Sequence, residues 1–208
     1  MPKALVSLAG MSVLAHAVRA LVSEPRVGLV VVAAPDGLED ALAAIATASA
    51  GGVRAIAVKG GATRAESVAR ALAVVPEEFD IVLVHDAARC LVPAEVVAAV
   101  IDAVLAGAVA VVPGAPVVDT IRELAVDGTS RTIERSRLRA VQTPQGFSAR
   151  VLRRAHATGD PRASDDAGMV EALGHPVELV AGHPRAFKVT TEQDLLLAEA
   201  ILAGQGGR

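Results

Sequence analysis

The chain has 208 residues, 52% of them hydrophobic and 1% aromatic, with a net charge of −3 and a pI near 6.0. This length suits one domain with a sizeable core, and the weak negative charge gives no reason to expect a nucleic-acid or acidic-membrane partner. A lone cysteine excludes an internal disulfide and fits a reducing compartment. With no signal-peptide pattern and no span-length apolar run, we predict a cytoplasmic location.

Short apolar runs alternate with helical patterns along the chain. The expected elements are helix 12–22, strand 27–34, helix 37–48, strand 53–58, helix 64–74, strand 80–84, helix Ala94–Leu105, strand 108–112, helices 149–156 and 164–173, strands 176–180 and 185–190, and helix 192–202. The last helix begins with a capping-box spacing from Thr190 to Gln193. Near-continuous β-branched runs are typical of a mainly parallel sheet covered on both faces. The alternation predicts a Rossmann-like, doubly wound α/β fold in a single domain, 1–208.

The segment 116–145 interrupts this rhythm. It shows polar alternation, an Asp127-Gly128 turn signal and no helical period, which predicts a projecting β-hairpin arm. A lone hairpin is marginally stable and needs a surface to lie against. A second subunit would supply one, so we expect a homodimer formed through this arm.

Polar residues follow the apolar run 81–84 in the stretch LVHDAARCLV. Ligands of open parallel sheets collect at the carboxyl ends of strands, so Asp86 is placed to hold a metal ion or substrate hydroxyls, with Arg89 close enough to serve the same ligand. The alternative is that Asp86 caps a turn and Arg89 is solvated. His85 fits either an acid–base role or a structural one.

Two further helix starts carry small or hydroxyl residues. Gly60 and Gly61 follow a strand end, where backbone amides could face a ligand, although Gly-Gly before a helix is also common for structural reasons. Ser164 opens another helix, where simple capping and ligand contact are equally consistent with the pattern.

Lysine is rare in this chain. Three lysines, Lys3, Lys59 and Lys188, stand against seventeen arginines among the 20 basic residues. Such a chain could keep Lys where a compact ammonium is needed, and codon bias is the alternative explanation.

Several common catalytic patterns do not occur in the sequence. It has no G-x-G-x-x-G, P-loop, H-E-x-x-H or G-x-S-x-G string, and its histidines share no metal-ligand spacing. These observations argue against dehydrogenases, P-loop kinases, zinc proteases and serine hydrolases.

Taken in order, a set of strings resembles one family, the 2-C-methyl-D-erythritol 4-phosphate cytidylyltransferases. The strings are PKALVSLAG, GGATRAESV, VHDAAR, PVVDTI, ERSRLRAVQTPQGF, SDDAGMVEALG and FKVTTEQDLLLAEAIL. They cover the chain from Pro2 to Leu202 in the family's order. The resemblance implies transfer of a cytidylyl group from CTP to 2-C-methyl-D-erythritol 4-phosphate, with Mg²⁺ or another divalent cation on the triphosphate.

The resemblance also implies roles for individual residues. Lys3 and Lys188 match the two lysines that contact phosphates and act in catalysis. Asp86 matches the aspartate that positions the methylerythritol moiety, with Arg89 beside it, and we assign the metal to Asp86 as well.

The remaining implied residues bind the two substrates. Gly60, Gly61 and Ser67 match the segment that lines the cytosine pocket. Ser164 stands where the family has a hydroxyl residue before an acidic pair. Arg135 matches an arginine of the dimer arm that reaches the partner's site and holds the substrate phosphate.

The chain departs from the family pattern at its start. Family members carry a strand and a glycine-rich loop of the form AAGxGxR before the PK motif, whereas Met1 precedes Pro2 here. We expect a start assigned too late, with a shortened, inactive nucleotide-binding relative as one alternative. A cytidylyltransferase for another sugar-alcohol phosphate, such as ribitol 5-phosphate, is the other.

Overall fold

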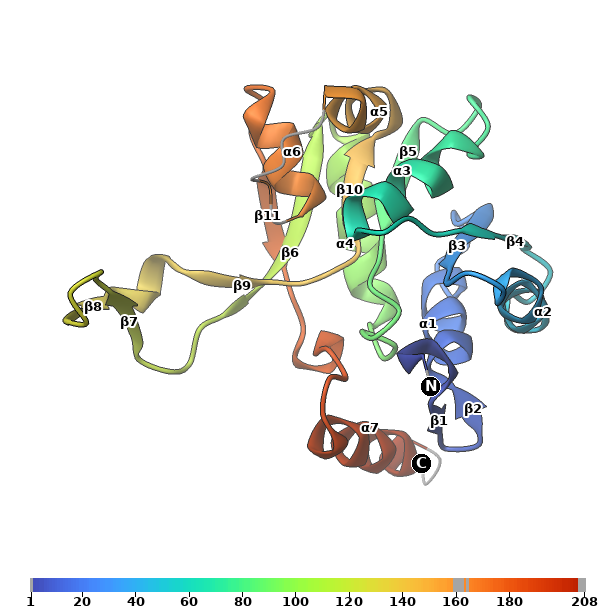
Figure 1. Ribbon diagram of the computed structural model, residues 1–208, viewed down its shortest axis with the longest axis horizontal. Helices are drawn as coiled ribbons and strands as arrows, with labels where there is room; N and C mark the ends of the chain where they lie inside the picture. Colours follow the sequence, from blue (N-terminus) through green and yellow to red (C-terminus); the bar gives the residue numbers. More distant parts are fainter. Residues whose placement is uncertain (1, 159–162, 164, 206–208) are drawn as a thin grey trace.

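The computed structural model describes residues 2–158, 163 and 165–205 as a mixed α/β chain (Figure 1). The helices are α1 (Val13–Val22), α2 (Glu39–Ser49), α3 (Arg64–Ala73), α4 (Ala94–Leu105), α5 (Ala149–Thr158), α6 (Asp166–Ala172) and α7 (Glu192–Gln205), with 3-10 turns η1 (Lys3–Leu5), η2 (Arg135–Arg137) and η3 (Pro184–Ala186). The strands are β1 (Ser7–Leu8), β2 (Met11–Ser12), β3 (Leu29–Ala34), β4 (Arg54–Lys59), β5 (Ile81–Val84), β6 (Ala110–Pro116), β7 (Ile121–Leu124), β8 (Ser130–Ile133), β9 (Arg139–Val141), β10 (Gln145–Ser148) and β11 (Glu178–Ala181). The predicted helix Ala94–Leu105 is α4, and the other predicted helices differ from the observed ones mainly at their ends.

The main sheet has five strands in the order β11-β6-β10-β5, with β9 beside β6. It is mixed, so the prediction of a mainly parallel sheet is wrong. The chain returns from the arm and inserts β10 between β5 and β6, antiparallel to both, while β11 is parallel to β6. Helices cover both faces of this sheet. Strands buried on both faces are apolar throughout whether they run parallel or antiparallel, which accounts for the continuous apolar runs.

Alternate residues of β6 belong to the two faces of the sheet. Ala110 and Val112 pack in a cluster with the fully buried Phe147 and with residues of α5 and α6. Val111, between them, packs with Val100 of α4 on the other face. A Cβ on Gly146 would lie 2.4 Å from the Val100 side chain, so glycine there allows α4 to approach β10 closely.

A second, two-stranded parallel sheet, β3–β4, lies beside β5 without pairing to it within the described residues. An apolar cavity of about 670 Å³ separates β3 from β5. Its strand walls include Val30, Val32 and Leu83, and α1 and α3 also line it, for example through Val18 and Val68. Helices packed against the strands of both sheets hold the two sheets together.

The predicted hairpin arm is present. β7 and β8 pair antiparallel and extend away from the main sheet (Figure 1). Asp127 Oδ1 accepts hydrogen bonds from the amide and hydroxyl of Thr129, which closes the turn. Val118, Leu124 and Val126 along the arm are largely exposed, so it presents apolar side chains to the outside.

The predicted strand 185–190 is wrong. Pro184 has no backbone N–H to pair in a ladder and instead begins the 3-10 turn η3, which His183 caps through Arg185 N. The extended chain that follows is fixed where Val189 N donates to Ala88 O at 2.8 Å. This bond lays the segment that carries Lys188 along the loop that follows β5.

The cap of α7 lies one residue later than the sequence indicates. Thr191 Oγ1 accepts from Asp194 N, and the Asp194 carboxylate accepts from the amides of Thr190 and Thr191. Asp194 therefore takes the part expected of Gln193, and these bonds fix the chain just after Lys188.

Candidate functional site

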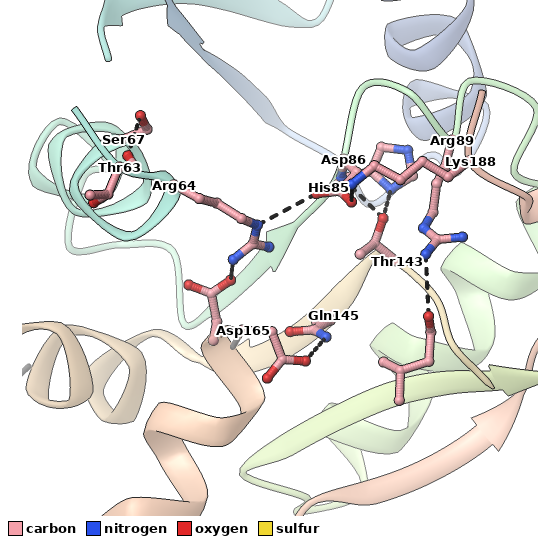
Figure 2. A network of polar contacts seen from close by, with 12 residues as sticks. Thr63, Arg64, Ser67, His85, Asp86, Arg89, Thr143, Gln145, Asp165 and Lys188 are labelled. Carbon is pink, nitrogen blue, oxygen red and sulfur yellow. Dashed lines mark hydrogen bonds and ion pairs between the residues drawn. The ribbon is translucent and has the colours of Figure 1, made fainter. Parts of the chain in front are cut away.

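The site is built around Asp86, two residues beyond the end of β5 (Figure 2). Its Oδ2 accepts a hydrogen bond from Lys188 Nζ at 2.9 Å, and its Oδ1 lies 3.5 Å from Arg64 Nε. Lys188 comes from the carboxyl-terminal segment and Arg64 is the first residue of α3. The fold thus brings together three charges from distant parts of the sequence.

The neighbouring cations keep Asp86 ionised. Burial acts to raise the pKa of its carboxyl group, but Lys188, followed by Arg64 and Arg89, outweighs burial and holds that pKa below its ordinary value. Asp86 is therefore a fixed negative charge at neutral pH, suited to accepting hydrogen bonds from hydroxyl groups.

Thr143 ties Asp86 to its neighbour His85. The Asp86 amide donates to Thr143 Oγ1 at 3.0 Å, and that hydroxyl also lies 3.0 Å from His85 Nδ1. Burial lowers the pKa of His85 to about 4, despite the opposing charge of Asp86. His85 is thus neutral near pH 7, with Nδ1 engaged, and the arrangement supports a structural role for this residue.

Arg89 contacts backbone carbonyls. Its Nη1 donates to Ala186 O at 2.8 Å and its Nη2 to Val141 O at 3.2 Å. Burial lowers the pKa of its guanidinium, and Asp86 opposes that effect. Arg89 therefore joins η3 and β9 to the loop that bears Asp86, while its role in binding substrate stays a prediction.

The predicted glycine segment forms a separate pocket of about 460 Å³. Gly60 N donates to Ala34 O at 2.7 Å, and Gly61 N donates to Ser67 Oγ at 3.0 Å. A Cβ on Gly61 would lie 2.2 Å from Glu66 Cβ, so the close turn requires glycine. Gly60, Gly61 and Ser67 are therefore brought together, one helical turn from Arg64.

Three other predicted residues lie differently. Lys3 Nζ donates to Thr190 O at 3.4 Å, two residues beyond Lys188 in sequence. Arg135 lies on η2 of the arm, where it donates to Val118 O, and among the residues that the structure describes it makes no contact with Asp86, Arg64 or Lys188. Ser164 lies outside the described residues.

Sequence reasoning missed several residues of the site. Arg64 contacts both Asp86 and Asp166, and Asp166 in turn contacts His156. A cation at the first residue of a helix opposes the helix dipole, and that signal could have identified Arg64. Thr143 gave no signal of its own, because its partners lie more than fifty positions away in the chain.

A dedicated metal cage is not present in the described part of the chain. No group of three or more His, Cys, Asp or Glu side chains gathers there. Asp86 is the one carboxylate at the centre of the cluster. Because Mg²⁺ is often bound by one or two carboxylates together with substrate phosphates, Asp86 fits an ion that arrives with a phosphorylated ligand.

Comparisons with known proteins agree on one family. The family model for IspD, 2-C-methyl-D-erythritol 4-phosphate cytidylyltransferase, matches residues 1–204. The chain is 50% identical over 211 residues to the enzyme of that name from Streptomyces coelicolor, covering 97% of this chain and 78% of the relative. It is 51% identical over 207 residues to that from Saccharopolyspora erythraea, covering 97% and 91%. The crystal structure of the Thermus thermophilus enzyme superposes with a TM-score of 0.82 at 40% identity, covering 97% of this chain and 94% of that one.

The low pKa of His85 predicts a pH dependence of stability. The folded pKa is about 4, whereas an unfolded histidine titrates near about 6.5. Between these values the unfolded state binds the extra proton, so the free energy of unfolding falls as the pH drops from about 6.5 to about 4. His85→Asn, which can still accept from Thr143, should make this fall shallower in urea titrations. An NMR titration midpoint of about 6.5 for the His85 imidazole in the folded protein would contradict its low pKa.

Proposed function

The chain belongs to the 2-C-methyl-D-erythritol 4-phosphate cytidylyltransferase family, and we propose that its two substrates meet at Asp86, Lys188 and Lys3. The enzyme transfers the cytidylyl group of CTP to 2-C-methyl-D-erythritol 4-phosphate, giving 4-diphosphocytidyl-2-C-methyl-D-erythritol and pyrophosphate. The observation that carries the site assignment is the 2.9 Å contact between Lys188 Nζ and Asp86 at a strand end.

Positioning and charge neutralisation carry the reaction. An oxygen of the polyol phosphate attacks the α-phosphorus of CTP in line, and pyrophosphate leaves from the opposite side. The attacking phosphate is already ionised, so no strong base is needed. This agrees with a neutral His85 whose Nδ1 lies 3.0 Å from Thr143. His85 is accordingly assigned no proton transfer.

The two lysines supply positive charge to the reacting phosphates. Lys188 Nζ contacts Asp86, and Lys3 Nζ contacts Thr190 O two residues further along the same segment. Both ammonium groups therefore contact or belong to the segment 188–190, which supports placing them at one edge of the site. There they would stabilise charge that develops on the phosphoryl oxygens in the transition state.

Asp86 would orient the polyol by accepting hydrogen bonds from its hydroxyl groups, with Arg89 close enough to serve the same ligand. Ser164 would bind the substrate phosphate. Asp86 would also hold the Mg²⁺, which when bound supplies charge neutralisation on the triphosphate. The cytosine ring would occupy the pocket at Gly60, Gly61 and Ser67, where the tight turn would let the backbone approach it closely.

The arm is proposed to form a homodimer and to complete the partner's site. Its exposed apolar residues need cover, and Arg135 lies on the arm away from the Asp86 cluster of its own chain. Arg135 would then bind the substrate phosphate in the partner's site. None of the helices in the described residues is long and apolar enough to cross a membrane, and a cytoplasmic location is part of this proposal.

Lys188→Ala should lower kcat at least about a hundredfold, because a charged contact to the transition state is lost. Pyrophosphate release with CTP and the polyol phosphate measures this. Arg19→Ala, which removes an exposed cation on α1, is the control and should turn over normally. A near-normal rate in the Lys188 variant would remove this residue from the mechanism.

A shared site predicts complementation between two inactive variants. Arg135→Ala and Lys188→Ala, co-expressed with different tags, form mixed dimers in which one of the two sites has both residues intact. Random pairing should therefore restore about a quarter of wild-type activity.

The matched control for complementation pairs Lys188→Ala with Asp86→Asn. Both residues belong to the cluster of one subunit, so every site in these mixed dimers is impaired and activity stays low. An Arg135→Ala and Lys188→Ala mixture that is no more active than this control would show that the arm does not serve the partner's site.

A further inference from the structure

A chain of charged contacts leads from the interior of the protein to the proposed site. His156 Nε2 lies 2.9 Å from Asp166 Oδ1, and Asp166 Oδ2 lies 2.6 Å from Arg64 Nη1. Arg64 Nε then lies 3.5 Å from Asp86 Oδ1 (Figure 2). Successive partners come from α5, α6, α3 and the loop after β5. Asp166 and His156 are not needed for any step of the mechanism described above.

The inner end of this chain of contacts is buried. The Asp166 side chain has no exposed surface, and that of His156 is 6% exposed. Burial acts to raise the pKa of Asp166, but His156 and Arg64 outweigh it and hold the pKa below its ordinary value. A buried carboxylate of this kind must be paired, so the position of Asp166 strongly restricts where the Arg64 guanidinium can lie.

The location of Arg64 is otherwise unfavourable. It is the first residue of α3, where the helix dipole disfavours a cation. The two carboxylates on either side of its guanidinium compensate for that position. His156 already provides Asp166 with one partner, so the pairing of Asp166 alone does not explain why Arg64 also faces outward to Asp86.

The planar guanidinium suits a bridge between two carboxylates. Nη1 meets Asp166 on the buried side while Nε faces Asp86 on the open side, so one rigid group fixes both. Without Arg64, the Asp86 carboxylate would be held by Lys188 from one side only. The Lys188 side chain is 47% exposed and carries its ammonium group on a flexible stem. With Arg64 in place, the carboxylate is held from two sides.

We infer that Arg64 is a positioning residue, anchored by the buried Asp166–His156 pair, that orients Asp86 toward the polyol substrate. This inference rests on the proposed function of Asp86. Arg64 acts through Asp86 and is not itself required to contact the reacting atoms.

The kinetic test compares Arg64→Gln with Arg154→Gln, which removes an exposed arginine of α5 next to the network. Arg64→Gln should raise the KM for the polyol phosphate about tenfold, as for a lost charge-assisted contact, while the KM for CTP changes little. Arg154→Gln should match the wild type. An unchanged polyol KM, or a fall in kcat with both KM values unchanged, would overturn the inference.

A double-mutant cycle tests the anchoring. Asp166→Asn should raise the same KM, and the double variant with Arg64→Gln should be no worse than Arg64→Gln alone, because both changes remove one interaction. Fully additive effects would contradict the anchor. If Asp166→Asn does not fold, His156→Gln replaces it with the same expectation.

A crystal structure of the Arg64→Gln variant separates failure of this inference from failure of the proposed function, because it needs no turnover. The Asp86 carboxylate should leave its present orientation while Lys188 and the backbone stay in place. An unmoved Asp86 would overturn the positioning role even if the enzyme assay supports the proposed reaction.

Discussion

The ion pairing of Asp86 is the constraint on which the site depends. A half-buried carboxylate at a strand end is stable as a charge only when cations compensate for its lost hydration. The fold meets that need from two directions, with Arg64 on α3 and Lys188 on the segment fixed by Val189 N and Ala88 O. The carboxylate therefore links the β3–β4 side of the molecule to its carboxyl-terminal region.

This arrangement suits a reaction between two phosphorylated molecules. Nucleotidyl transfer to a phosphate requires alignment and compensation of negative charge more than proton transfer. The described site offers an ionised carboxylate, a lysine in contact with it, and a histidine kept neutral by burial. The fold places these charges beyond the carboxyl end of β5, and the arm extends away from the main sheet (Figure 1).

Local sequence signals predicted the parts of this structure that depend on local physics. The helix Ala94–Leu105, the hairpin turn at Asp127 and the strand end before Asp86 follow from periodicity and turn chemistry. Strand direction could not be read this way, because a strand buried on both faces is apolar whether its neighbours are parallel or antiparallel. The bridge from Arg64 to Asp166 spans 102 positions and exists only after the chain folds.

The charge of Asp86 is the central feature of the proposed site and can be measured directly. The ¹³C shift of its carboxyl carbon, followed by NMR through an acid titration of the free protein, reports that charge site by site. The paired carboxylate should titrate below the ordinary aspartate value of about 3.9. A midpoint at or above that value would mean that Lys188 and Arg64 do not hold it in solution, and the proposed site would lose its centre.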